Sequence, residues 1–129
     1  KNILFKEELL AQIYYFNKPG GIIFPTPDSQ EMQCGYGQVS ERKVIKPHIH
    51  KSIKRNIENT SEFIYIINGE MEVTFLSPEG NIITNENIQS GEAFLQFKGG
   101  HKITFSANTR YFELKQGPYL GNTIDKATI

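Results

Sequence analysis

The chain of 129 residues is long enough to bury one hydrophobic core, and its 14 basic and 14 acidic residues balance each other. This balance gives no reason to expect a nucleic acid or an anionic membrane as partner, and no apolar run approaches the ~18–20 residues of a membrane-spanning helix. Cys34 is the single cysteine, so an internal disulfide is excluded and a reducing compartment fits. With no signal-peptide pattern at its start, we expect a soluble, cytoplasmic protein of one domain.

The first 20 residues are expected to form a helical segment. Apolar residues recur along residues 3–17 at a spacing that places them on one side of a helix of about four turns. A breaker cluster at residues 18–21 would end this helix. The residues of the apolar stripe are Phe5, Leu9, Ile13 and Phe16.

From residue 32 to residue 115 the pattern changes to short strands, and we expect these residues to form a barrel. One or two strands are expected within residues 32–45, and another should end at the histidines that follow. Residues 62–68 and 70–76 read as strands joined by a tight hairpin at Asn68-Gly69. Many short strands with turn signals between them indicate a sandwich or barrel. The remaining expected strands are residues 82–84, 91–97, 102–106 and 111–115, and residues 116–129 should form a tail along the surface.

The three histidines and one glutamate suggest a metal site. His48 and His50 are two residues apart, so an extended strand would send both imidazoles to the same face. Glu62 opens the next expected strand, and His101 follows a Gly-Gly pair near a later one. Imidazoles with a carboxylate suit one divalent transition metal (Zn, Fe, Mn or Ni) and leave coordination positions open. The competing interpretation is that these are unrelated surface or core residues.

These residues also carry a resemblance to a known family. His48-Ile-His50, followed by Glu62 and Gly69, resembles the first signature of the cupins, in which two histidines and a glutamate hold the metal. The stretch from Gly91 to His101 is similar to the second signature, with His101 as the fourth ligand. The resemblance implies an all-β fold, the cupin double-stranded β-helix (a jelly-roll-like barrel), here with a short N-terminal helix before it.

Two departures from the cupin pattern affect this reading. Eleven residues separate His50 from Glu62, where most cupins have three or four, and we interpret residues 51–61 as an insertion in the connecting loop. If Glu62 is not a ligand, Glu58 is the substitute. Phe97 stands where the second signature has a proline, which changes only the rigidity of a turn.

The end of the chain narrows the resemblance. The run from Tyr111 to Tyr119, with Asp125-Lys126 shortly after it, resembles the ending of the WbuC-type cupin metalloproteins. These small single-domain proteins are associated with O-antigen polysaccharide clusters. The resemblance therefore implies a role in bacterial surface-polysaccharide metabolism, without a settled reaction.

Several other residues are candidates for contacts with a small-molecule ligand. Arg55, with Lys51 and Lys54, could overhang the barrel mouth and bind an anionic group, although a solvated loop is the simpler interpretation. Gln96 is a polar residue in an apolar strand, so it either faces the cavity and orients a ligand or faces solvent. Tyr65 could line a sugar-stacking pocket or lie in the core. Tyr65 and Glu92 are also candidates for a general base.

Three functions remain open. The first is a metal-dependent enzyme that acts on a small polar or sugar-derived molecule, by isomerase, epimerase or oxygenase-type chemistry. The second is a non-catalytic module that binds or senses a sugar. The third is a metal-free carbohydrate epimerase-like cupin, in which a histidine moves the proton. In each case we expect a homodimer, because Phe63, Tyr65 and Ile67 suggest an apolar outer face.

Overall fold

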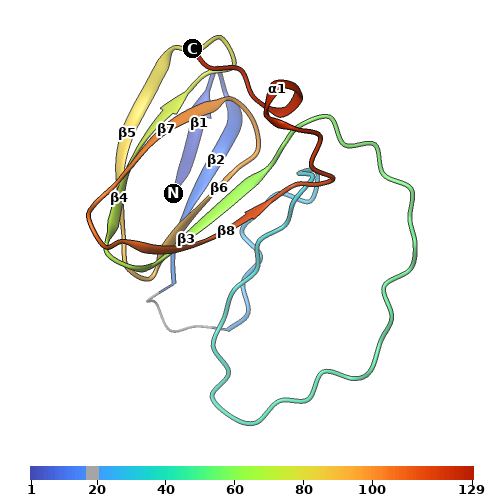
Figure 1. Cartoon of the computed structure of the whole chain (residues 1–129). Helices are drawn as coiled ribbons and strands as arrows, with labels where there is room; N and C mark the ends of the chain where they lie inside the picture. Colours follow the sequence, from blue (N-terminus) through green and yellow to red (C-terminus); the bar gives the residue numbers. More distant parts are fainter. Residues whose placement is uncertain (17–20) are drawn as a thin grey trace.

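A computed structural model describes residues 1–16 and 21–129, and these residues form an all-β fold with two antiparallel sheets (Figure 1). The five-stranded sheet has the order β1-β2-β6-β3-β8, and the three-stranded sheet has the order β5-β4-β7. The strands are β1 (Asn2–Phe5), β2 (Glu8–Tyr15), β3 (Glu62–Asn68), β4 (Glu70–Leu76), β5 (Ile82–Gln89), β6 (Glu92–Gln96), β7 (Gly100–Phe105) and β8 (Arg110–Lys115).

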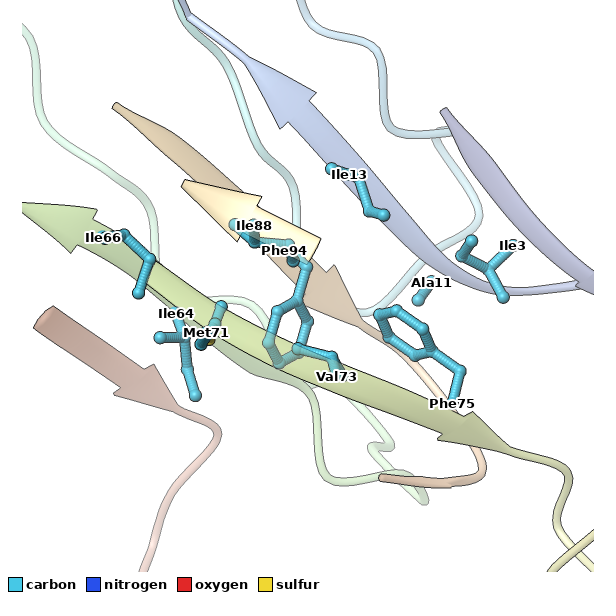
Figure 2. Packing of buried hydrophobic residues seen from close by; sticks show 10 residues of the cluster. All are labelled: Ile3, Ala11, Ile13, Ile64, Ile66, Met71, Val73, Phe75, Ile88 and Phe94. Atoms are coloured by element: carbon cyan, nitrogen blue, oxygen red, sulfur yellow. The ribbon is translucent and has the colours of Figure 1, made fainter. Parts of the chain in front are cut away.

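The hydrophobic core lies between the two sheets (Figure 2). Alternate residues of each strand point inward, as the two-residue period of a strand requires. The rings of Phe75 and Phe94 meet edge to face with their centroids 5.5 Å apart, which is a favourable arrangement for two aromatic rings. The buried residues of this cluster are Ile3, Ala11, Ile13, Ile64, Ile66, Met71, Val73, Phe75, Ile88 and Phe94.

The prediction of an N-terminal helix is wrong, because residues 2–15 form the antiparallel hairpin of β1 and β2. The predicted end of the helix and most of its breaker cluster fall on residues 17–20, which lie outside the described residues. Lys6 and Glu7 make the turn with positive φ angles of 49° and 67°, as a two-residue hairpin turn of the I′ type requires. β2 lies between β1 and β6, and five consecutive residues of it are buried. The residues of the predicted stripe are divided between the two faces of the sheet, because Ile13 packs in the core whereas Leu9 and Phe16 pack on the outer face. A strand buried on both faces carries apolar residues at most positions, and such a run also contains the spacing of a helix.

The predicted strands on either side of Asn68-Gly69 are confirmed, but the tight hairpin between them is wrong. β3 pairs with β6 and β8, whereas β4 pairs with β5 and β7. Gly69 is therefore a corner at which the chain passes from one sheet to the other. It has a φ of 99°, and a Cβ atom there would lie 2.4 Å from the hydroxyl oxygen of Thr109. Glycine is the residue that fits such a corner.

Residues 21–61 add no strand longer than a single bridge, between Ile23 and Tyr36. The strands expected within residues 32–45 and at His48 and His50 are therefore not formed. Residues 21–36 partly cover the outer face of the five-stranded sheet, where Met32, Cys34 and Tyr36 pack against a second apolar cluster. Residues 38–58, which we call the arm, are exposed along their whole length and leave the two sheets as a long loop (Figure 1).

The two sheets do not close into a barrel within the part of the chain that the structure describes. β7 and β8 are the edge strands on the open side, and each pairs with one neighbour only among the described residues. Tyr111 and Phe105 stack face to face there with their centroids 4.4 Å apart, and both remain partly exposed. After β8 the chain forms a short helix, α1 (Asn122–Asp125), and ends across one end of the sandwich. In the described residues no helix has the length and apolar character needed to cross a membrane.

Truncating Phe94 tests the core. Its side chain is fully buried against Phe75, so Phe94→Ala should lower the free energy of unfolding by about 3–5 kcal/mol through lost burial and a cavity. Urea denaturation measures this change. Ile82 is 69% exposed, so Ile82→Ala is the control and should change stability by less than about 0.5 kcal/mol. A comparable effect of both substitutions would contradict this assignment of the core.

Candidate functional site

A cavity of about 430 Å³ opens at one end of the space between the two sheets. Glu62 at the start of β3 and Gln96 at the end of β6 are direct cross-strand neighbours, so both side chains point to the same face of their sheet. His101 of β7 reaches the cavity from the opposite sheet, next to the ring of Phe94. Residues 125–129 of the C-terminal tail form part of the cavity wall.

Gln96 fixes the orientation of His101. Its amide nitrogen donates hydrogen bonds to the carbonyl oxygens of Lys98, at 2.9 Å, and Gly100, at 3.0 Å. These two acceptors settle which end of the amide is nitrogen, so the amide oxygen accepts a short hydrogen bond from Nδ1 of His101. The proton of neutral His101 is thereby assigned to Nδ1, which leaves the lone pair of Nε2 free. A polar partner on one imidazole nitrogen is the usual support of a histidine that binds a metal through the other.

Glu62 lies opposite that free nitrogen. Its Oε2 atom is 3.6 Å from Nε2 of His101, and the two side chains are 14% and 23% exposed. Burial, followed by the neighbouring carboxylate of Glu113, raises the pKa of Glu62 to about 7. Burial, followed by the charge of Lys126, lowers the pKa of His101. Although the distance is within the range of a salt bridge, burial displaces the pKa of each group toward its neutral form. We therefore describe them as a neutral pair.

Three charged residues around this pair are not among the site residues predicted from the sequence. Glu113 and Lys115 come from β8, and Lys126 comes from the tail; the two lysines lower the pKa of Glu62 and so partly offset its burial. The register brings Lys115 opposite Glu62. The alternation of residues 111–115 indicates a strand with two different faces, but only the pairing of β8 with β3 shows which face is the inner one.

The structure brings together two of the four predicted metal ligands. Glu62 and His101 meet in the cavity, whereas His48 and His50 lie in the arm, both exposed, with their rings 5.1 Å apart. Nδ1 of His48 is 3.0 Å from the carbonyl oxygen of Lys46. Within residues 1–16 and 21–129, no group of three or more His, Cys, Asp or Glu side chains is assembled around one point. The four-residue metal site therefore stays a prediction.

The predicted ligand contacts are distributed differently. Gln96 is buried and lines the cavity. Tyr65 lies on the other face of β3 from Glu62, packed near Phe16 with ring centroids 5.8 Å apart. Arg55 is exposed in the arm. Of these three residues, the structure places only Gln96 at the cavity, and no ligand contact is established for any of them.

The two acidic alternatives lie outside the cavity. The backbone N–H groups of Glu58 and Asn59 donate hydrogen bonds to the carboxylate of Glu31, at 3.2 and 3.1 Å, which closes the base of the arm. The carboxylate of Glu92 accepts a hydrogen bond from the backbone of Gln89, at 3.0 Å, in the turn between β5 and β6. Neither residue lines the cavity with His101.

The arrangement of Gln96, His101 and Glu62 has two chemical uses. An imidazole nitrogen with a free lone pair beside a carboxylate forms half of a metal-binding set. The same two groups can exchange a proton with a bound molecule, because the pKa of Glu62 is close to neutral. Comparison with protein-family models, curated proteins and solved structures gives no significant match.

The raised pKa of Glu62 predicts a pH-dependent loss of stability in chelator-treated protein. Between about pH 4.5 and 7 the folded state holds a proton that the unfolded state has lost, so the free energy of unfolding falls as the pH rises. Glu62→Gln should remove this loss and be more stable than the unsubstituted protein at pH 8 by about 1–2 kcal/mol, with allowance for the remaining solvent contact.

Urea titrations at pH 5 and pH 8 measure the difference. Glu72 is exposed on β4, so Glu72→Gln is the matched control and should leave the pH dependence of the unsubstituted protein in place. The lowered pKa of His101 has the opposite effect, because it raises the free energy of unfolding as the pH rises. This contribution is the same in the unsubstituted protein and in both variants. Equal pH slopes for Glu62→Gln and the unsubstituted protein would contradict the raised pKa.

Proposed function

We propose that the protein is a metal-binding cupin of the double-stranded β-helix type and that Glu62 and His101 are two of its ligands. The observation that carries the proposal is the 3.6 Å separation of Oε2 of Glu62 from Nε2 of His101. Two ligand atoms that each lie ~2.0–2.2 Å from a tetrahedral metal ion are roughly 3.3–3.6 Å apart. The pair therefore needs little movement to share one ion, and the hydrogen bond from His101 to Gln96 already selects the nitrogen that would bind it.

His48 and His50 complete the proposed ligand set. Their two-residue spacing lets both imidazoles reach one point when that stretch is extended. A set of three imidazoles and one carboxylate suits Zn, Fe, Mn or Ni. Four ligands fill a tetrahedral shell, so a position for water or a ligand is open where the metal takes five or six ligands. The raised pKa of Glu62 agrees with this role, because a buried carboxylate without a cation holds its proton and a bound metal would replace it.

The proposed activity is the conversion of a small polar or sugar-derived molecule in bacterial surface-polysaccharide metabolism. A bound metal would supply a Lewis acid, which suits isomerase, epimerase or oxygenase-type chemistry. The cavity wall combines Gln96 with Lys115, Asp125 and Lys126, and such groups hydrogen-bond to hydroxyl and carboxylate groups. A non-catalytic cupin that binds a sugar would use the same wall.

One observation favours the metal-free alternative. Glu62 has a pKa of about 7, and the free nitrogen of His101 lies 3.6 Å from it. One group that gives up a proton near neutrality and one that accepts it are the components of a general acid–base pair. A carbohydrate epimerase-like reaction, in which His101 moves the proton of the substrate, needs no metal.

Metal analysis separates these two functions. Purified protein incubated with Zn²⁺ and then desalted should retain about one ion per chain, and His101→Ala should lose it. Gln96→Leu keeps all four proposed ligands but removes the acceptor that orients His101, so it should weaken Zn²⁺ binding by about 10- to 100-fold.

Isothermal titration calorimetry measures both variants. Tyr65→Phe is the control, because Tyr65 lies on the opposite face of β3, and it should bind as the unsubstituted protein does. Absence of Zn²⁺, Fe, Mn and Ni from protein that has never met a chelator, together with no uptake in the titration, would favour the metal-free function.

A further inference from the structure

The arm lacks the contacts that normally hold a segment in a folded chain. Every residue from 38 to 58 is exposed, and no backbone group of residues 38–57 hydrogen-bonds to the backbone of another described residue. An extended segment whose backbone groups are unpaired can add to the edge of a sheet as a further strand. Its base, however, is held, because Glu31 accepts hydrogen bonds from residues 58 and 59.

The side chains of the arm alternate as those of a strand at a sheet edge do. Its isoleucines occupy odd positions, so in an extended conformation all of them lie on one face, and His48 and His50 lie on the other. Pro47 cannot donate to a ladder of hydrogen bonds on both sides, which restricts the arm to an edge. Ile49 is 92% exposed. The isoleucines are Ile45, Ile49, Ile53 and Ile57.

β8 offers an edge with the same division of faces. Phe112 and Leu114 pair with Tyr65 and Phe63 on the outer face of the sheet, yet they are 50% and 51% exposed. The alternate residues of β8, which include Glu113, lie on the inner face with the core residues of β3. In a strand added beside β8, the isoleucines would therefore share the outer face with Phe112 and Leu114, although β8 is long enough to contact only one or two of them, and both histidines would lie on the inner face.

Charge favours the contact between an arm and the rest of the chain. The arm holds six of the 14 basic residues and two of the 14 acidic ones, which leaves the remainder with an excess of four acidic residues. On β8 itself Glu113 is the acidic residue of the inner face, and Arg110 and Lys115 lie at the two ends of the strand, so the charge argument concerns the body as a whole. A basic segment and an acidic body attract each other in two copies of one chain, since each copy supplies both parts.

We infer that the arm adds to β8 of a second copy of this chain, and that two copies exchange their arms in a closed homodimer. The structure favours a second copy because the arm extends away from the two sheets of its own chain (Figure 1). Its end is held in that position by the hydrogen bonds from residues 58 and 59 to Glu31. In a reciprocal exchange each arm pairs with β8 of the other copy, so both copies make the same contact. The position of the two histidines rests on the proposed function: His48 and His50 of one copy would join Glu62 and His101 of the other.

A single substitution in the arm tests the exchange. The unsubstituted protein should have the mass of a dimer by light scattering, with or without chelator, and Ile49→Asp should have the mass of a monomer. Phe112→Asp at the receiving edge should have the same effect. Ile82→Asp is the matched control on β5, where the residue is 69% exposed, and it should remain dimeric. A monomeric unsubstituted protein, or a dimer that survives Ile49→Asp, would overturn the exchange of arms.

Mixed dimers test whether the site is shared. His48→Ala/His50→Ala and Glu62→Ala/His101→Ala chains with different tags are produced together, and dimers that carry both tags are isolated. Each chain alone should retain no Zn²⁺, whereas the mixed dimer contains one complete site of two and should retain about half of the Zn²⁺ of the unsubstituted dimer.

The outcomes separate the two proposals. Zn²⁺ in the unsubstituted dimer but none in the mixed dimer would mean that each chain supplies its own histidines, which overturns the shared site and leaves the proposed function standing. If the unsubstituted dimer takes up no Zn²⁺, the metal-binding function fails, and the masses of Ile49→Asp and Phe112→Asp decide the exchange of arms by themselves.

Discussion

The hydrogen bonds of Gln96 are the constraint on which the candidate site depends. A buried amide must satisfy its donors and its acceptor. Gln96 donates to the carbonyl oxygens of Lys98 and Gly100, at and just before the start of β7, and accepts from the imidazole of His101. These contacts connect the end of β6 in one sheet to the start of β7 in the other, at the edge of the apolar core. They also leave one nitrogen of His101 without a proton beside Glu62, so a structural requirement of the fold sets the geometry of the proposed site.

The sandwich is open on the side of β7 and β8, where no further strand covers its apolar surface in the described residues. The aromatic stack of Phe105 and Tyr111 and the apolar surface of Phe112 and Leu114 lie at edge strands, where a further strand would cover them. An uncovered sheet edge can pair with a further strand, and an extended arm without backbone partners among the described parts of the chain can supply one. The two features occur in one sequence and share the same division of apolar and polar faces, and this match supports the proposed exchange of arms.

Local signals in the sequence predicted the presence of each strand from residue 62 onward, because short runs of β-branched and aromatic residues between glycines favour strands. The length of β5 was underestimated: it continues to Gln89, beyond the predicted end at residue 84, because its polar residues pair with β4. Local signals could not show that Gly69 is a corner between sheets, since strand pairing depends on partners distant in sequence. The hairpin of residues 2–15 was missed because Lys6-Glu7 carries none of the usual turn residues. At the site, Glu62, Gln96 and His101 could be selected by residue type, but Glu113 and Lys126 depend on long-range register and on the course of the tail.

The unpaired backbone of the arm has a consequence for the lifetime of the free chain. Peptide bonds that are exposed and not hydrogen-bonded fit readily into the active site of a protease, and this segment carries Arg42, Lys43, Lys46, Lys51, Lys54 and Arg55, which are cleavage points for trypsin-like enzymes. A chain whose arm finds no cover is therefore open to cutting between its first two strands and the remainder of its sheets. Degradation would then remove solitary chains selectively, while covered arms would escape it.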